Sequence, residues 1–185
     1  MFDFARVKAI IFDLDDTLVK TSLDFELIKK QIECPKEADI LSFIDSLECD
    51  QLRREAHKIV LEHEMQDAHT SIWMPGAQEF VNNALARELP LAIVTRNCRE
   101  ATRVKIDNNQ IPISIVLTRE DAPAKPDPTA LHMVNQHWQL QTHEVAYIGD
   151  YKYDIEAAQN ASMQAWLFEP NNEGICFAKN LRLML

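Results

Sequence analysis

The segment Ile10-Ile11-Phe12-Asp13-Leu14-Asp15-Asp16-Thr17-Leu18 passes from an apolar run to three carboxylates within four residues. Residues 7–12 are predicted to form a buried strand, and Asp13 and Asp15 would then point to the same side of an extended chain. Crowding like charges at a strand end costs free energy, which a divalent cation would offset. Because parallel α/β sheets keep their binding sites at this edge, we expect a functional site here.

Four further short apolar runs predict strands buried on both faces, and helical patterns separate the later ones. The predicted strands are residues 91–95, 114–118, 145–149 and 164–168, and the predicted helices are residues 78–88, 99–108, 129–138 and about 154–160. This alternation predicts an α/β fold with a doubly wound, parallel, five-stranded sheet and right-handed crossovers.

Residues 19–74 break the alternation, because their apolar residues recur at helical spacing in about three successive groups. Pro75-Gly76 then marks a turn back toward the sheet. We therefore predict a small all-helical cap over residues 19–74, inserted after the first strand of an α/β catalytic core formed by residues 1–18 and 75–185.

Composition limits the partners and the compartment. The formal net charge of -10 argues against a general nucleic-acid or anionic-membrane binder. No run is long enough to span a bilayer, and residues 1–8 lack the apolar core of a secretory signal. The cysteines, at positions 34, 49, 98 and 176, have no CxxC spacing, which favours a reducing cytoplasm and argues against a zinc site. We expect a cytoplasmic protein.

Polar residues also follow the second predicted strand, in the order Thr95-Arg96-Asn97, just before a predicted helix. A hydroxyl and the free N–H groups of a helix N-terminus suit a phosphate oxyanion. The alternative is that Thr95 or Asn97 simply caps the helix.

Two later clusters carry charge. Lys125 lies in Ala124-Lys125-Pro126-Asp127-Pro128, where Asp127 and Pro128 suit a helix start, although a lone lysine is usually a solvated surface charge. The strand that ends at Gly149 is followed by Asp150, and by Asp154 four residues later; helix capping is the alternative role for these carboxylates. The carboxyl ends of parallel strands share one edge, so all of these groups can converge there.

The chain resembles the haloacid dehalogenase-like superfamily, and its inserted helices resemble the cap of the phosphoglycolate-phosphatase-like branch. The resemblance rests on the order and approximate spacing of Asp13-Leu14-Asp15-Asp16-Thr17, Thr95, Lys125 and Gly149-Asp150 with Asp154. It implies a Rossmann-like core. The insertion is short for a full cap of that branch.

The resemblance also implies roles for individual residues. Asp13 would be the nucleophile that forms an aspartyl-phosphate, and Asp15 the general acid and base. Mg²⁺ would be held by Asp13, the Asp15 backbone carbonyl and Asp150, while Asp154 would hold the metal's water shell or Lys125. The phosphoryl group would be bound by Thr95, Arg96, Asn97 and Lys125.

These roles describe a magnesium-dependent phosphatase acting on a small phosphorylated metabolite. A phosphomutase resembles it in every core motif. A receiver-type phospho-switch is a non-enzymatic alternative, disfavoured because the middle strand lacks the expected terminal aspartate and is followed by Thr118-Arg119. The substrate and the oligomeric state are left open by the sequence.

Overall fold

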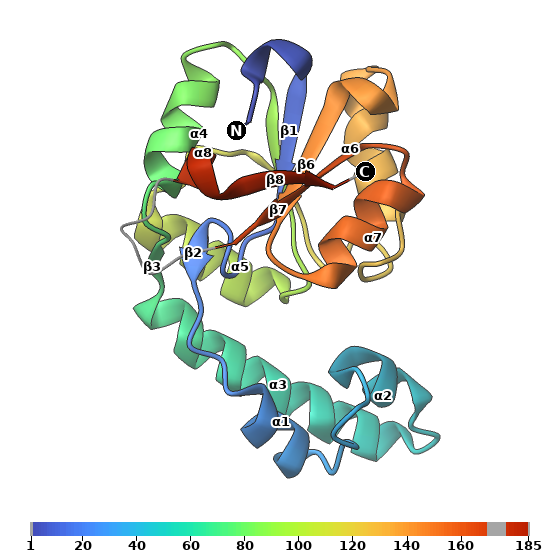
Figure 1. The fold of residues 1–185 in the computed structure, drawn as a ribbon. Helices are drawn as coiled ribbons and strands as arrows, with labels where there is room; N and C mark the ends of the chain where they lie inside the picture. The colour runs from blue at the N-terminus through green and yellow to red at the C-terminus, as the bar shows by residue number, and fades with distance from the viewer. Residues whose placement is uncertain (1, 170–176, 185) are drawn as a thin grey trace.

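A central sheet with helices on both faces forms the larger part of the molecule (Figure 1). The computed structural model describes residues 2–169 and 177–184. Its sheet has the strand order β5-β4-β1-β6-β7-β8. The strands are β1 (Ala9–Phe12), β4 (Leu91–Val94), β5 (Ile115–Leu117), β6 (Val145–Gly149), β7 (Gln164–Phe168) and β8 (Leu181–Met184).

The predicted doubly wound parallel sheet is confirmed, and the structure adds a sixth strand to the five expected. β1, β4, β5, β6 and β7 are parallel, whereas β8 pairs antiparallel with β7 at the sheet edge. Only Leu181 of β8 is buried, and the other three residues of the strand are exposed. A four-residue edge strand of this kind has too little apolar periodicity to be recognised from sequence. Position 185 lies outside the described residues.

Helices cover both faces of the sheet. α4 (Ala77–Leu85) and α8 (Phe177–Asn180) contribute to one hydrophobic cluster, and Ile106 of α5 (Arg99–Asn109) packs against it. α6 (Thr129–Trp138) and α7 (Lys152–Asn160) cover the opposite face. Two short 3-10 helices, η1 (Phe4–Arg6) and η2 (Thr142–Glu144), complete the core. No helix among the described residues is long and apolar enough to cross a bilayer.

Three helices stand apart from the sheet: α1 (Phe25–Gln31), α2 (Ile40–Ser46) and the longer α3 (Asp50–Thr70) (Figure 1). We call them the cap helices. They share a small core of their own, built on Ile28, Ile44 and Val60. The chain enters and leaves this region through β2 (Val19–Lys20) and β3 (Ile72–Trp73), which pair antiparallel. These two short strands were not expected from the sequence, because two residues cannot display a period.

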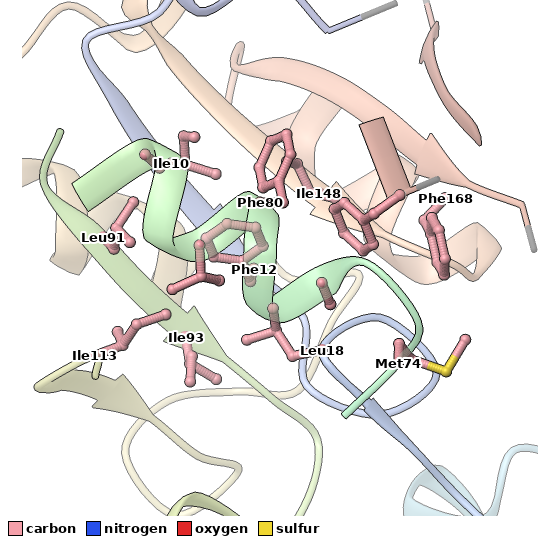
Figure 2. Packing of buried hydrophobic residues seen from close by; sticks show 14 of the residues in the cluster. Ile10, Phe12, Leu18, Met74, Phe80, Leu91, Ile93, Ile113, Ile148 and Phe168 are labelled. Carbon is pink, nitrogen blue, oxygen red and sulfur yellow. The ribbon is translucent and has the colours of Figure 1, made fainter. Parts of the chain in front are cut away.

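Phe80 of α4 lies at the centre of the larger core cluster, close to Phe12 and Ile148 (Figure 2). Its ring centroid is 5.1 Å from that of Phe2 and 5.0 Å from that of Phe177. The helix that follows Pro75-Gly76 is therefore fixed to the sheet by aromatic packing, and the exit from β3 is fixed with it.

Replacing Phe80 with alanine should lower the free energy of unfolding by about 3–5 kcal/mol, because the change leaves a cavity within an aromatic cluster. Urea denaturation followed by circular dichroism would measure this. Leu85→Ala in the same helix is the matched control. That side chain is 38% exposed, so the loss should stay below about 1 kcal/mol. Similar losses in both variants would show that Phe80 has no central role.

Candidate active site

The polar residues predicted from the sequence line one cavity of about 610 Å³. It lies between the carboxyl edge of the sheet and the cap helices, which contribute apolar side chains including Ile28, Ile40 and Val60. The sheet-side residues are Asp13, Asp15, Thr95, Arg96, Asn97, Lys125, Asp150 and Asp154. β4, β1 and β6 are neighbours in the sheet, so their ends place Thr95, Asp13 and Asp150 side by side.

Lys125 is buried, with 4% of its surface exposed, and is not the solvated surface charge that a lone lysine usually is. Its Nζ donates hydrogen bonds of 2.6 Å to Asp13 Oδ1, to Asp154 Oδ1 and to the hydroxyl of Tyr147. The Tyr147 hydroxyl in turn lies 3.2 Å from the Val94 carbonyl oxygen, to which it donates. One ammonium therefore joins the aspartate after β1 to the aspartate in α7. The helix after this loop begins at Thr129, as the predicted range 129–138 has it, but its N-cap is Pro128 and not Asp127.

Three carboxylates meet beside Lys125. One oxygen each from Asp13, Asp150 and Asp154 lies within 4.8 Å of the others, a donor set of the kind that hard divalent cations prefer. Both Asp154 oxygens already accept hydrogen bonds, Oδ1 from Lys125 and Oδ2 from the Tyr151 backbone N–H. Asp13 and Asp150 accept from described side chains through Oδ1 only, which makes them the carboxylates better placed to face a cation.

Burial and the crowding of these carboxylates raise the pKa values of Asp13 and Asp150. Burial raises the pKa of Asp13 well above its usual value, and the charges of Asp154 and Asp150 add to the rise, although Lys125 opposes it. Burial, followed by the charges of Asp154 and Asp16, raises the pKa of Asp150 to about 7. One lysine does not neutralise three carboxylates, so the site fits a bound divalent cation, which would favour their ionised forms.

Asp15 has a different environment from Asp13. Its Oδ2 accepts a 2.6 Å hydrogen bond from the Asn97 side-chain amide, and its Oδ1 contacts the ammonium of Lys105 in α5. Burial raises the pKa of Asp15, while Lys105 and Asn97 act in the opposite direction. Asp13 and Asp15 therefore contact different lysines, Lys125 and Lys105 respectively.

In the loop after β4, the Thr95 side chain contacts the loop's own backbone, whereas the Arg96 side chain contacts the cap. The Thr95 hydroxyl accepts a 3.1 Å hydrogen bond from the Asn97 backbone N–H, which orders the turn. Arg96 instead turns toward the cap, where its Nη2 lies 2.8 and 2.7 Å from the two carboxylate oxygens of Asp39. Its guanidinium also lies over the Tyr153 ring, 4.7 Å from the centroid. Of the four predicted phosphate ligands, Arg96 is the one that a cap carboxylate engages.

Three of the residues that contact the predicted site residues were missed from the sequence: Lys105, Tyr147 and Asp39. Tyr147 gave a usable signal, since a tyrosine within a fully buried strand must find a partner for its hydroxyl. Lys105 gave none, because it lies on a helix face with Ala101, Thr102 and Asn109, where no apolar period marks burial.

Comparison with known proteins shows the family to which the chain belongs. A model of the haloacid dehalogenase-like hydrolases matches residues 10–168. The chain belongs to this family. A haloacid dehalogenase-like hydrolase domain-containing protein of Arabidopsis thaliana is 28% identical over 168 residues, covering 84% of this chain and 68% of that protein.

Solved structures show the same architecture. A predicted phosphoglycolate phosphatase from Haemophilus somnus has a TM-score of 0.70 at 19% identity, covering 96% of this chain and 92% of that chain. A Thermotoga maritima protein described as a beta-phosphoglucomutase has a TM-score of 0.65 at 19% identity, covering 94% and 91%. At these identities the likeness is one of fold. The family membership and the doubly wound core predicted from the sequence are thus confirmed.

The metal-free protein should lose stability as the pH rises from about 5.5 to about 8. The raised pKa values of Asp13, Asp15 and Asp150 mean that, above the ordinary value of 3.8, the folded state binds more protons than the unfolded state. The free energy of unfolding therefore falls with rising pH in this window. Added Mg²⁺ should stabilise the protein more at the higher pH, where the carboxylates are ionised. Thermal unfolding with EDTA or Mg²⁺ measures both effects.

Two further acids, Asp39 and Asp67, act outside this window. Burial alone would raise the pKa values of Asp39 and Asp67, but hydrogen bonds from Ser42 and Lys105 respectively lower them. Their contribution is lost only when the pH falls below the ordinary value of 3.8. Asp150→Asn is the control, and it should reduce the pH dependence between about 5.5 and 8. Stability that rises with pH in EDTA would contradict the assignment.

Proposed function

We propose that this protein is a magnesium-dependent phosphatase that hydrolyses a small phosphorylated metabolite through an aspartyl-phosphate on Asp13. The observation that carries the proposal is the position of the Asp13 carboxylate. It lines the cavity at the end of β1, beside the Lys125 ammonium, with Asp150 as a neighbouring carboxylate. Membership of the hydrolase family supports the reaction type.

Positive charge is the first requirement of this reaction, because a carboxylate must approach a phosphate dianion. Each pair of like charges at ~4 Å costs on the order of 4 kcal/mol at an effective dielectric constant of ~20. In our proposal Asp13, the Asp15 backbone carbonyl and Asp150 would hold Mg²⁺, while Asp154 keeps Lys125 in place. Such an ion would supply two positive charges, which would offset the repulsion and polarise the phosphoryl group.

In the first step an oxygen of Asp13 attacks phosphorus and the bond from phosphorus to the leaving oxygen breaks. Asp15 donates its proton to that oxygen, so an alcohol departs and Asp13 carries the phosphoryl group. In the second step Asp15 accepts a proton from water as the water oxygen attacks phosphorus. The bond from phosphorus to Asp13 then breaks, and inorganic phosphate leaves. The raised pKa of Asp15, caused by burial, suits a group that must hold a proton before it donates it.

The remaining residues orient the transferring group. The Lys125 ammonium contacts Asp13, so its positive charge lies close to the phosphate oxygens while the bond between Asp13 and phosphorus forms. The Thr95 hydroxyl lies on the same cavity wall, and we assign it as a donor to a phosphate oxygen. The Asn97 and Cys98 backbone N–H groups already donate to the Thr95 hydroxyl and to Glu64. We assign Asn97 two roles, as a phosphate ligand and as a hydrogen-bond donor to Asp15, which its side-chain amide contacts.

A phosphomutase shares every step up to the aspartyl-phosphate and differs only in the acceptor, a sugar phosphate in place of water. The fold likeness to a protein described as a beta-phosphoglucomutase keeps this as the second candidate. Release of inorganic phosphate without any added acceptor, over many turnovers, would distinguish the phosphatase. It would also exclude a receiver-type switch, which is phosphorylated once.

With p-nitrophenyl phosphate and Mg²⁺, the protein should release phosphate continuously, and EDTA should abolish turnover. Asp13→Asn should reduce turnover by on the order of 10⁴-fold or more, because the amide is not a nucleophile. Its circular dichroism spectrum should match that of the wild type, since the amide has the same size. Full activity in EDTA, or a phosphoryl group trapped on a residue other than Asp13, would refute the mechanism.

Asp15→Asn should affect poor leaving groups most, because an alkoxide needs a proton as it departs whereas nitrophenolate leaves largely unaided. An alkyl phosphate should lose on the order of 10²–10⁴-fold in turnover. With p-nitrophenyl phosphate the second step still lacks its base, so a burst of nitrophenol should precede slow turnover. Rapid-mixing measurements of nitrophenol release would detect it. Equal losses on both esters without a burst would remove the acid–base role of Asp15 and leave the nucleophile assignment unaffected.

A further inference from the structure

Lys105 is a fully buried lysine that the reaction described above does not use. None of its surface is exposed, and it does not line the cavity. Its Nζ contacts Asp15 Oδ1 on one side and lies 2.7 Å from Asp67 Oδ2 on the other. A buried ammonium needs partners of opposite charge, and here it has one carboxylate from the active-site motif and one from the cap helix α3.

Asp67 is fixed on its far side by the linker that leads from β2 into the cap. Its Oδ1 accepts hydrogen bonds from the Ser22 backbone N–H at 2.6 Å and from the Ser22 hydroxyl at 2.8 Å. Its Oδ2 also accepts a 3.0 Å hydrogen bond from the Thr21 hydroxyl. Asp67 therefore joins three pieces of chain: α3, the linker and, through Lys105, helix α5. The Asp67 carboxylate of the cap helix α3 therefore helps to fix the position of the Lys105 ammonium.

The two oxygens of Asp15 are not equivalent in this arrangement. Oδ1 faces Lys105, which is outside the cavity, whereas Oδ2 accepts from Asn97, which lines it. A proton carried on Oδ2 can reach a leaving group in the cavity once the Asn97 amide moves aside. A proton on Oδ1 would lie against an ammonium. The lysine therefore selects which oxygen is presented to the substrate.

We infer that Lys105 is a positioning residue for Asp15, which it holds by one oxygen so that the other faces the cavity, with Asp67 anchoring it to the cap linker. The inference rests on the proposed acid–base role of Asp15. An acid must lie within hydrogen-bond reach of the oxygen that it protonates. A misplacement of about 1 Å can cost on the order of 10²-fold in rate.

The test uses the double variant Lys105→Met with Asp67→Asn. Removing the lysine alone would leave Asp15 and Asp67 facing each other without a cation, and such a variant is at risk of not folding. In the wild type the three groups carry one positive and two negative charges. The double variant keeps only the charge of Asp15, so the net charge of the cluster is the same. The amide that Asp67→Asn introduces also retains an oxygen that can accept the linker hydrogen bonds.

The matched control is Arg119→Gln with Glu64→Gln. Arg119 and Glu64 form another largely buried ion pair between α3 and the sheet domain, and neither residue contacts Asp15. This control removes the charges of a cap-to-core ion pair and leaves the Lys105 cluster intact. Glu64 and Arg119 also bind the Cys98 N–H and the Arg96 carbonyl, on either side of Asn97, and the side-chain amides of the two substitutions can keep those hydrogen bonds. It therefore separates a general loss of cap anchoring from a specific loss of Asp15 orientation.

Crystal structures give the first readout and do not depend on phosphatase activity. In the Lys105→Met/Asp67→Asn variant, Asp15 should leave Asn97 or occupy more than one rotamer, whereas wild type and control should keep the hydrogen bond. Retention of the wild-type rotamer in the double variant would overturn the inference. Failure of the proposed function is recognised separately, as wild-type protein that turns over neither ester with Mg²⁺.

Leaving-group dependence gives the second readout. The Lys105→Met/Asp67→Asn variant should lose on the order of 10²-fold in kcat for an alkyl phosphate. With p-nitrophenyl phosphate it should show a burst of nitrophenol before slow turnover, as Asp15→Asn should, since attack by Asp13 needs no acid there whereas the second step needs a base. In the control variant any loss should be the same for both esters. Equal losses on both esters without a burst of nitrophenol in the double variant would show a merely structural role for Lys105.

Discussion

The close approach of carboxylates at the ends of two neighbouring strands is the constraint on which the rest of the structure depends. β1 and β6 are adjacent in the sheet, and the Asp13 N–H donates to the Ile148 carbonyl, so Asp13 and Asp150 have no means of moving apart. The repulsion between their carboxylates must be compensated by positively charged groups from other parts of the chain. The loop before α6 brings Lys125, and α7 brings Asp154 to hold that lysine. The order of the strands thus places the two repelling carboxylates side by side. It also determines which elements, the loop before α6 and α7, lie close enough to compensate the repulsion.

The two aspartates of the first motif show how environment separates chemically identical groups. Each lies against a buried lysine that a second aspartate also binds: Lys125 is shared with Asp154 of α7, and Lys105 with Asp67 of α3. Asp13 shares its space with Asp150, whereas Asp15 accepts from a neutral amide. Different surroundings for paired carboxylates are the usual basis for different roles in acid–base and nucleophilic chemistry.

Much of the fold and of the cavity wall could be predicted because both follow from short-range pattern. Buried parallel strands read as apolar runs, and the chemistry at their ends follows immediately in the chain, as in Asp13 after β1 or Asp150 after β6. The features that could not be predicted from the sequence depend on contacts between segments that are distant along the chain. β8 has one buried residue and pairs with β7 across a connection, and Lys105 is buried by Asp15 and Asp67 rather than by its own helix. The Arg96–Asp39 ion pair likewise joins core and cap, and neither residue carries a local sign of it.

The ribbon formed by β2 and β3 has a consequence for how this architecture tolerates change. The chain leaves the core and returns to it at adjacent points, since Val19 pairs with Trp73. The ends of the inserted segment are therefore held together whatever lies between them. The entropy of closing such a loop grows only with the logarithm of its length, so adding or removing a helix beyond the ribbon costs little in closure. The cavity wall formed by the cap helices can thus diverge in evolution while the carboxylate-bearing edge of the sheet keeps its geometry.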